Sequence, residues 1–327
     1  MRAFEYASPS TKEEAVRLLS GMAGEAEVLA GGTDLLSLMK DDVLKPKRLV
    51  NIKAVGELAG IRFDAKGLRI GALTTLAELM SEARVEKEYP ALVQACAGVR
   101  SPQIQAMGTV GGDLCQRPRC WYFRGGFGLL AVQSGKSMVV DGDNRYHAIL
   151  GNEGPAYFVN PSSLAPPLIA FGATLRIFGP SGRREVALEK FYRTPKNESE
   201  KELALGPDEV VTDILVPPAA GRKNATYEVR QREALDWPFA TASATLEMRG
   251  TNIMKARIVM GHVAPIPWVA VESQRLLEGK ELTEELAAAA GDAAVQGARP
   301  LSRNGYKVQL ARVAVKRAIL RASGKEV

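Results

Sequence analysis

The sequence of 327 residues has little cysteine, little histidine and only 6% aromatic residues. Three cysteines, Cys96, Cys115 and Cys120, are too few and odd in number for a disulfide framework, which excludes a small disulfide-stabilised secreted fold. With two histidines, neither zinc-ligand spacing nor a serine, histidine and aspartate set stands out. The net charge of +6 is not gathered into a block of like charges, so charge gives no support to nucleic-acid binding.

Long apolar runs are also missing. No run reaches the roughly 18 residues that a membrane span requires. The amino end carries acidic residues where a signal peptide needs an apolar core. Together with the low cysteine content, these absences predict a cytoplasmic protein that contacts neither membrane nor nucleic acid.

The residues that are present predict a folded protein with large cores. Hydrophobic residues make up 46% and charged residues 24% of the chain, and its length favours two or three domains. The pattern predicts an early strand at 26–30 and a helix at 35–43. It also predicts a helical stretch at 74–99 that Pro90 interrupts. The carboxyl-terminal third predicts strands at 225–232, 239–250 and 253–264, followed by helices at 282–298 and 304–323.

Two glycine turns are the strongest candidates for a binding site. LAGGTDLL (29–36) places Gly31 and Gly32 between a predicted strand and a helix start, where unpaired backbone N–H groups favour a phosphate. GTVGGDL (108–114) is a second turn of the same character. A double glycine is often only a tight connection. Two such turns, each with a threonine beside the glycines, indicate a ligand with two phosphates, which means a dinucleotide.

A Rossmann dinucleotide site is excluded by its context. Gly126, Gly128 and Ala131 match the loose G-x-G-x-x-A pattern. The segment that follows runs only about five residues before the next break, too short for the helix that must hold the pyrophosphate.

The two turns belong to a series of segments that resembles a known family. LAGGTDLL, IGALTTLAEL, GTVGGDL, NPSSLAPPLIAFGATL, YEVRQREALDW, GHVAPIPW and NGYKVQLARVAVKRA follow one another between about residues 3 and 322. In this order they resemble the FAD-binding medium subunit of the molybdenum hydroxylases, the group of carbon monoxide dehydrogenase, xanthine dehydrogenase and aldehyde oxidoreductase.

The resemblance implies an α+β fold. A FAD-binding domain of the vanillyl-alcohol-oxidase (PCMH) type, built of two subdomains, is expected first, and a CO-dehydrogenase-flavoprotein-like α+β domain last. We place subdomain 1 at residues 1–57, subdomain 2 at 58–218 with an inserted loop at about 116–158 that carries a small hairpin, and the carboxyl-terminal domain at 219–327.

The resemblance also implies the residues that bind FAD. Both glycine turns are expected to hold the pyrophosphate through backbone N–H groups. Ser163 stands where relatives carry an aspartate that contacts the sugar portion of the flavin, and Arg230 is nearest to a lysine that approaches the flavin ring in many relatives. Asp113 replaces the usual asparagine and brings an acceptor-only carboxylate near phosphate. The expected cofactor-binding residues are Leu29, Ala30, Gly31, Gly32, Thr33, Asp34, Leu35, Thr109, Gly111, Gly112, Asp113, Gln116, Ser163 and Arg230.

The inserted loop bears on metal binding. A subset of the family that resembles the flavin subunits of 4-hydroxybenzoyl-CoA reductase and periplasmic aldehyde oxidoreductase binds a 4Fe-4S cluster there through four cysteines. This chain has the loop but only Cys115 and Cys120 in it. Asp143 and His147 are poor substitutes, so we predict no cluster and no metal site. The aromatic stretch 121–123 is expected either to anchor the loop in the core or to form part of an interface.

The implied function is that of an oxidoreductase subunit without catalytic side chains. FAD, bound non-covalently, is its expected cofactor, while molybdopterin and 2Fe-2S clusters are expected on a large and a small partner subunit. The chain would pass electrons from the 2Fe-2S clusters to an external acceptor such as NAD⁺, a quinone or oxygen. Two alternatives stay open: a non-catalytic assembly subunit that has lost FAD, and a free-standing flavin oxidase of the same fold.

Overall fold

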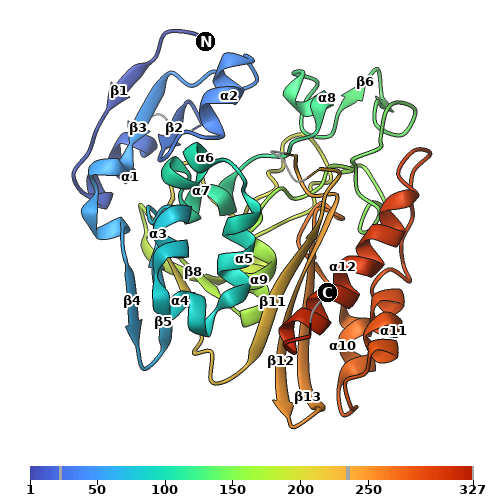
Figure 1. The fold of residues 1–327 in the computed structure, drawn as a ribbon. Coiled ribbons are helices and arrows are strands. Elements are labelled where there is room, and N and C mark those ends of the chain that lie inside the picture. The colour runs from blue at the N-terminus through green and yellow to red at the C-terminus, as the bar shows by residue number, and fades with distance from the viewer. Residues whose placement is uncertain (22–23, 233–235, 326–327) are drawn as a thin grey trace.

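The computed structural model of the chain describes residues 1–21, 24–232 and 236–325. Its amino-terminal part is a three-stranded parallel sheet in the order β1-β3-β2, seen in blue in Figure 1. Because side chains alternate along a strand, Ala26 and Val28 pack with α1 and leave Glu27 free to face the other side. The elements are β1 (Glu5–Ala7), α1 (Lys12–Ser20), β2 (Ala26–Leu29), α2 (Leu35–Lys40), β3 (Arg48–Asn51), and the 3₁₀ turns η1 (Ile52–Ala54) and η2 (Gly56–Leu58).

A five-stranded antiparallel sheet follows, in the order β4-β5-β10-β8-β9. Its central strand, β10, arrives in the chain long after its neighbour β5, so this sheet depends on distant pairing. Its strands are β4 (Ile61–Asp64), β5 (Gly67–Gly71), β8 (Thr174–Gly179), β9 (Gly182–Ala187) and β10 (Val210–Val216), and the 3₁₀ turn η3 (Leu188–Lys190) follows β9.

The helical stretch expected at 74–99 is divided into three helices. The predicted break at Pro90 is confirmed, since this proline begins the third helix. A second break falls at Glu82, whose side chain accepts a hydrogen bond from the backbone N–H of Arg84 at 3.3 Å. The helices are α3 (Leu76–Ser81), α4 (Ala83–Glu88) and α5 (Pro90–Gly98).

Several short elements were not predicted from the sequence. Helix α7 begins inside the second glycine turn, and helix α9 contains two prolines in its first turns. The expected hairpin of the inserted loop is present as β6 and β7. The elements of this part of the chain are α6 (Pro102–Met107), α7 (Val110–Cys115), α8 (Trp121–Arg124), β6 (Val132–Gln133), β7 (Lys136–Ser137) and α9 (Ala165–Phe171).

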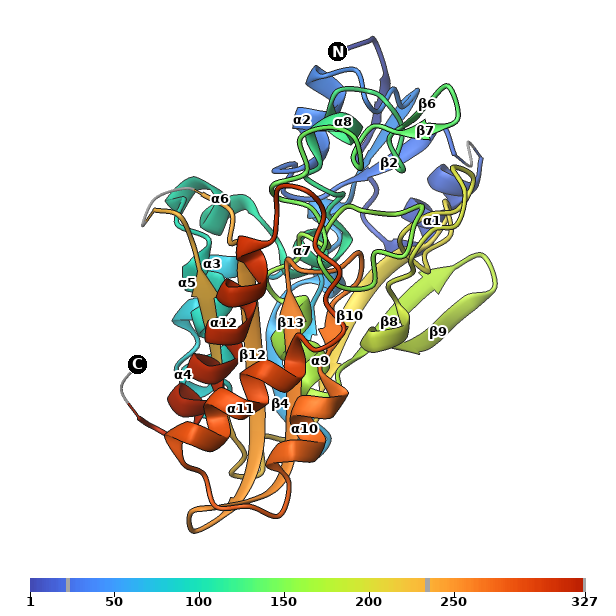
Figure 2. The same ribbon diagram turned by 90° about the vertical axis from the view of Figure 1, so that its right-hand side faces the viewer.

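The carboxyl-terminal sheet is antiparallel, in the order β11-β12-β13-β14, and lies between two groups of helices. Helices α10 and α12 cover one face, while α5 and α9 contact the other, as Figures 1 and 2 show. The three predicted strands and the two predicted helices are confirmed, whereas β14 and α10 were not predicted. The elements are β11 (Lys223–Val229), β12 (Ala240–Arg249), β13 (Asn252–Gly261), β14 (Trp268–Val269), α10 (Val271–Leu277), α11 (Glu284–Ala294) and α12 (Tyr306–Ala322).

The inserted loop is fastened to this last domain by buried polar contacts. Lys307 Nζ of α12 donates to the carbonyls of Tyr146 (3.2 Å), His147 (3.0 Å) and His262 (2.8 Å). Burial lowers the pKa of this amine to about 7. Asn304 Nδ2 donates to the His147 carbonyl at 3.1 Å. Phe123 is buried with Leu38 of α2, so the loop is anchored at both ends.

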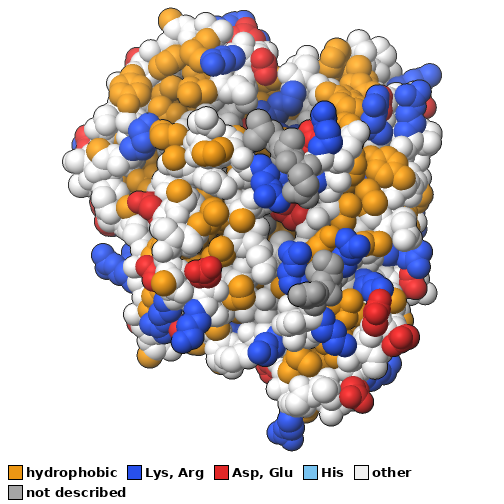
Figure 3. Space-filling model, viewed as in Figure 1, with side chains coloured by type: hydrophobic (Ala, Val, Ile, Leu, Met, Phe, Trp, Pro, Cys, Tyr) orange, Lys and Arg blue, Asp and Glu red, His pale blue; other side chains and the backbone are white. Residues whose placement is uncertain are grey.

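One face of the molecule shows how its charged side chains are distributed (Figure 3). Lys and Arg side chains are scattered over the face seen in Figure 3 rather than gathered in one patch. Within the described ranges, no helix is both long and apolar enough to cross a membrane.

Candidate functional site

Two adjoining cavities meet at the two glycine turns. The first has a volume of about 230 Å³ and the second about 160 Å³. Both are lined by Thr33 and Asp34 of the first turn and by Thr109, Gly112 and Gln116 of the second. The fold therefore brings together two segments that lie far apart in the sequence, and an elongated ligand can lie across their junction.

The first turn presents unpaired backbone donors. It follows β2, and its residues line the first cavity. In the part of the chain that the structure describes, the backbone N–H groups of Gly31, Gly32, Thr33 and Asp34 make no hydrogen bond. Gly32 has a φ of +73°, and a Cβ on Gly31 would overlap the carbonyl of Met107. Only glycine permits this approach, and the free donors are suited to a phosphate.

The second turn has no free donors at the corresponding place. Val110 and Gly111 donate their N–H groups to the carbonyls of Thr74 (2.8 Å) and Ala72 (2.9 Å). Gly112 donates to Thr109 Oγ1 at 3.0 Å, and Asp113 donates to the Thr109 carbonyl at 2.8 Å. The premise that both turns offer unpaired N–H groups is therefore wrong for residues 110–113.

Asp34 joins the first turn to the inserted loop. Its carboxylate accepts from the backbone N–H of Arg117 and from Arg124 Nη2, each at 2.8 Å. It also accepts from Arg119 Nη1 at 2.9 Å. Asp34 makes no side-chain cap bond to α2. Its role in this structure is to position the turn rather than to cap the helix.

The Asp113 carboxylate points away from the glycine turns into a buried nest of donors. It accepts from Ser162 Oγ at 2.5 Å and from the N–H groups of Leu164 (3.0 Å) and Ser163 (3.3 Å). Gln116 Nε2 donates to it at 2.9 Å. Burial raises the pKa of Asp113, and these hydrogen bonds oppose the shift. An acceptor-only carboxylate thus has protein donors as partners in this structure, and Asp113 also lines the second cavity.

Arg230 is held by partners within the protein. Its guanidinium contacts the carboxylate of Glu228 and the carbonyl of Gly98, and Nη1 donates to the Asp236 carbonyl at 3.2 Å. Burial raises the pKa of Glu228, and Arg230 opposes that shift. Arg230 lines the second cavity beside Ser163 and Trp237.

All but one of the expected site residues line the two cavities. Leu29 lies instead in a small core with Met39 and Leu49, where it is 8% exposed. The first cavity holds Ala30, Gly31, Gly32, Thr33, Asp34, Leu35, Thr109, Gly111, Gly112 and Gln116, and the second adds Asp113, Ser163 and Arg230.

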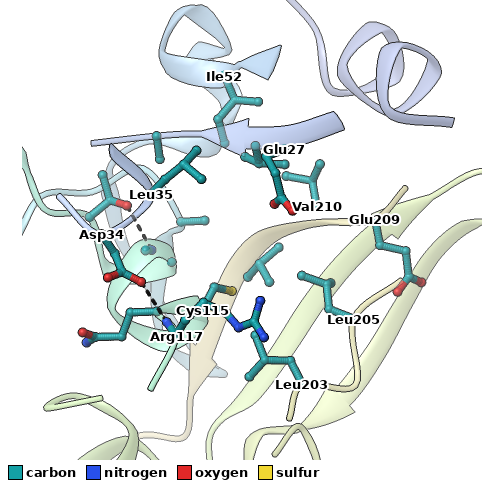
Figure 4. A pocket seen from close by; sticks show the side chains of 18 of the residues that line it. Glu27, Asp34, Leu35, Ile52, Cys115, Arg117, Leu203, Leu205, Glu209 and Val210 are labelled. Atoms are coloured by element: carbon teal, nitrogen blue, oxygen red, sulfur yellow. Dashed lines mark hydrogen bonds between the residues drawn. The ribbon is translucent and has the colours of Figure 1, made fainter. Parts of the chain in front are cut away.

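Other lining residues were not predicted from the sequence. Figure 4 shows Glu27 pointing from β2 into the first cavity, opposite Leu203, Leu205 and Val210. Arg117 crosses the same cavity to reach Glu202. These residues carry no local motif, and only the distant pairing of β10 brings the segment before it to the glycine turn.

The two loop cysteines face different surroundings. Cys115 lines the first cavity, and burial raises its pKa to about 12. Cys120 Sγ lies 3.1 Å from His147 Nε2, beside a third cavity of about 320 Å³ that adjoins the second through Arg119 and Trp237. Over residues 1–21, 24–232 and 236–325, no group of three or more His, Cys, Asp or Glu side chains could hold a metal ion.

The residues present fit a flavin dinucleotide. Free N–H groups lie at the junction of two cavities, so a diphosphate at this point leaves one aromatic end for each cavity. The α+β fold and this site define the class: a two-part FAD-binding domain followed by a flavoprotein carboxyl-terminal domain.

Comparison with known proteins gives the particular family. Residues 2–219 match the FAD binding domain in molybdopterin dehydrogenase, and residues 225–322 match the CO dehydrogenase flavoprotein C-terminal domain. The chain belongs to the FAD-binding medium subunits of the molybdenum hydroxylases, the family of CO dehydrogenase, xanthine dehydrogenase and aldehyde oxidoreductase, and is an oxidoreductase component.

Individual relatives are similar over almost their whole length. The chain is 30% identical to the aldehyde oxidoreductase FAD-binding subunit of Escherichia coli (strain K12), covering 95% of this chain and 96% of the relative. It is also 30% identical to the carbon monoxide dehydrogenase medium chain of Hydrogenophaga pseudoflava, covering 97% and 96%. A solved structure of the carbon monoxide dehydrogenase from that organism superposes with a TM-score of 0.78 at 29% identity, covering 99% and 98%.

Proposed function

We propose that this chain binds FAD non-covalently across the two cavities and transfers electrons within a multi-subunit molybdopterin enzyme. Electrons would arrive from the 2Fe-2S clusters of a small subunit and leave for an external acceptor, while molybdopterin would sit on a large subunit. The observation that carries this proposal is the row of free N–H groups at residues 31–34, placed where the two cavities meet.

The names of the relatives support the assembly. The relatives include a FAD-binding subunit of an aldehyde oxidoreductase and a medium chain of a carbon monoxide dehydrogenase, names that place them in larger enzymes. Because the chain matches both over nearly its full length, we extend this arrangement to it. We keep the domain boundaries near residues 57 and 218, the cytoplasmic location and the absence of a 4Fe-4S cluster as parts of the proposal.

The chain would bind and orient the cofactor. The first turn would receive the diphosphate through its N–H groups, with Thr109 and Gln116 beside it. Ser163 and Arg230 would line the flavin end. When bound, FAD supplies the ability to accept single electrons and to deliver two. Asp34 and Asp113 would hold the two turns in position, each through hydrogen bonds to protein groups.

The experiment that tests the proposal is an absorption spectrum of the purified chain, followed by cofactor extraction and an iron assay. Flavin near one per chain with little iron supports it. A colourless protein that does not bind added FAD would instead identify an assembly subunit without FAD. Iron at about four atoms per chain would show that the loop binds a cluster after all.

A further inference from the structure

The two cavities differ in what they offer to the two ends of FAD. The second contains Ser163, Arg230 and Trp237, the end assigned above to the flavin. The first runs from the glycine turn along β2 and is walled by apolar side chains, among them Ile52, Leu73 and Val210. The adenosine end of the cofactor therefore belongs in the first cavity, where apolar walls can contact the flat faces of a purine.

One acidic side chain in the first cavity has no partner. Asp34, Glu202 and Glu209 also line it, but Asp34 and Glu202 bind loop arginines and Glu209 binds Arg184. Among the described residues, Glu27 makes neither a hydrogen bond nor an ion pair. Burial raises the pKa of its carboxyl, and the charges of Lys201 and Arg117 oppose the shift. A buried carboxylate needs hydrogen-bond donors, and a ligand in the cavity can supply them.

The distance of Glu27 from the first glycine turn determines which part of the ligand its side chain can reach. Glu27 lies four positions before Gly31, so at the usual rise of a strand the two are at most roughly 13 Å apart. The ribose lies next to the diphosphate, whereas the base lies beyond the sugar. Figure 4 shows the carboxylate of Glu27 pointing into the cavity that Asp34 and Leu35 of the turn also line. The outer edge of adenine carries an amino group that donates hydrogen bonds.

We propose that the Glu27 carboxylate accepts a hydrogen bond from the exocyclic amino group of the FAD adenine and so selects adenine in the first cavity. This inference rests on the proposed function, because it assumes that FAD binds here. The carboxylate provides specificity for the base and takes no part in electron transfer.

The test compares FAD with flavin hypoxanthine dinucleotide, in which an oxygen replaces the adenine amino group. Apoprotein of the full chain is titrated with each, and with FMN, while flavin fluorescence is followed. We expect wild type to bind FAD about tenfold or more tightly than the hypoxanthine analogue. In Glu27→Gln the preference should disappear or reverse, since an amide can donate to the oxygen. FMN, which lacks adenosine, should bind wild type and variant equally.

Two further variants keep the result interpretable. Glu27→Ala should weaken FAD binding and abolish the discrimination. Glu25→Gln, a neighbour paired with Lys47 at the surface, should behave as wild type. Equal affinities of wild type for FAD and the analogue, or an equal loss for both in Glu27→Ala, would overturn the inference while leaving FAD binding intact. Failure of wild type to bind FAD at all would instead refute the proposed function.

Discussion

The two glycine turns have similar sequences but different environments. Each combines a glycine pair with a threonine and an aspartate and leads into a short helix. Among the described residues, no acceptor binds the N–H groups of residues 31–34 in the first turn, which lines a cavity, whereas in the second turn those of residues 110–113 are bound to protein acceptors. The N–H groups of the first turn are therefore available to a ligand, whereas those of the second fix that turn to the protein.

The two aspartates show the same contrast. Asp34 reaches across to the inserted loop and binds three of its arginines, and Asp113 reaches back to the start of α9. Both carboxylates are engaged by donors of the protein itself. A glycine turn thus needs a second element to fix it, and in both turns the acidic residue that follows the glycines supplies that contact.

The largest effect on stability is expected from Asp113→Ala. It would leave Ser162 Oγ and the N–H groups of Ser163 and Leu164 buried without an acceptor, at a cost of about 3 kcal/mol in the free energy of unfolding. Chemical denaturation measures this cost. If the second turn mainly supports the structure, the fraction that stays folded should keep its FAD affinity. A loss of FAD binding without a loss of stability would contradict the difference drawn between the two turns.

The buried carboxyl of Asp113 also predicts that the stability of the protein depends on pH. Because burial raises the pKa of Asp113 above its ordinary value of 3.8, the folded protein holds this proton to higher pH than the unfolded chain. Its contribution to stability is therefore greatest in acid and falls as pH rises from about 4 through the folded-state pKa. Asp113→Asn cannot titrate, so its stability relative to wild type should improve between pH 4 and neutrality. If the difference in the free energy of unfolding between Asp113→Asn and wild type does not change with pH, the pKa of Asp113 is not raised in the folded protein.

Gly31→Ala is expected to remove FAD binding. The added methyl group would overlap the carbonyl of Met107, push the turn from its place, and cost about 2 kcal/mol of stability. Fluorescence titration with FAD and chemical denaturation report the two effects separately. Gly56→Ala is the matched control, since no atom lies within 4 Å of its new methyl group. Unchanged FAD affinity in Gly31→Ala would exclude the first turn as the phosphate site.

Asp34→Asn should have an intermediate effect on both quantities. The neutral side chain weakens the contacts to Arg119 and Arg124, at a cost of about 1.5 kcal/mol. FAD affinity should fall several-fold because the first turn loses its connection to the loop. The surface variant Asp42→Asn, whose carboxylate is 45% exposed, is the control and should change neither quantity.

The smallest effect separates the two threonines. Thr109→Val removes the hydroxyl that accepts from the Gly112 N–H and should cost about 1 kcal/mol of stability. Thr33→Val alters an exposed side chain and should leave stability within about 0.5 kcal/mol of wild type. Equal losses for the two variants in thermal unfolding would show that both turns are capped alike.

Much of the fold could be predicted from the sequence because its signals are local. Thr11 and Thr283 begin helices that their own side chains cap, and the alternation in 225–264 gave three strands of the last sheet. The short helices α6, α7 and α9 could not be predicted, since glycine and proline within them resemble turn signals. The first cavity was also beyond prediction, because its far wall comes from residues 201–211.

The sequence by itself determined the family, the strands and helices of the carboxyl-terminal third and the two places where glycine lets backbone come close to another group. Only the tertiary structure decided which turn keeps its donors free. The carbonyls of Ala72 and Thr74 accept from the second turn after the chain has folded, whereas among the described residues no acceptor binds the N–H groups of residues 31–34. A backbone N–H is the same group in either turn, so its availability depends on which distant acceptor packing brings beside it. The same holds for the Glu27 carboxylate, because only the packing of distant segments decides that no donor among the described residues binds it.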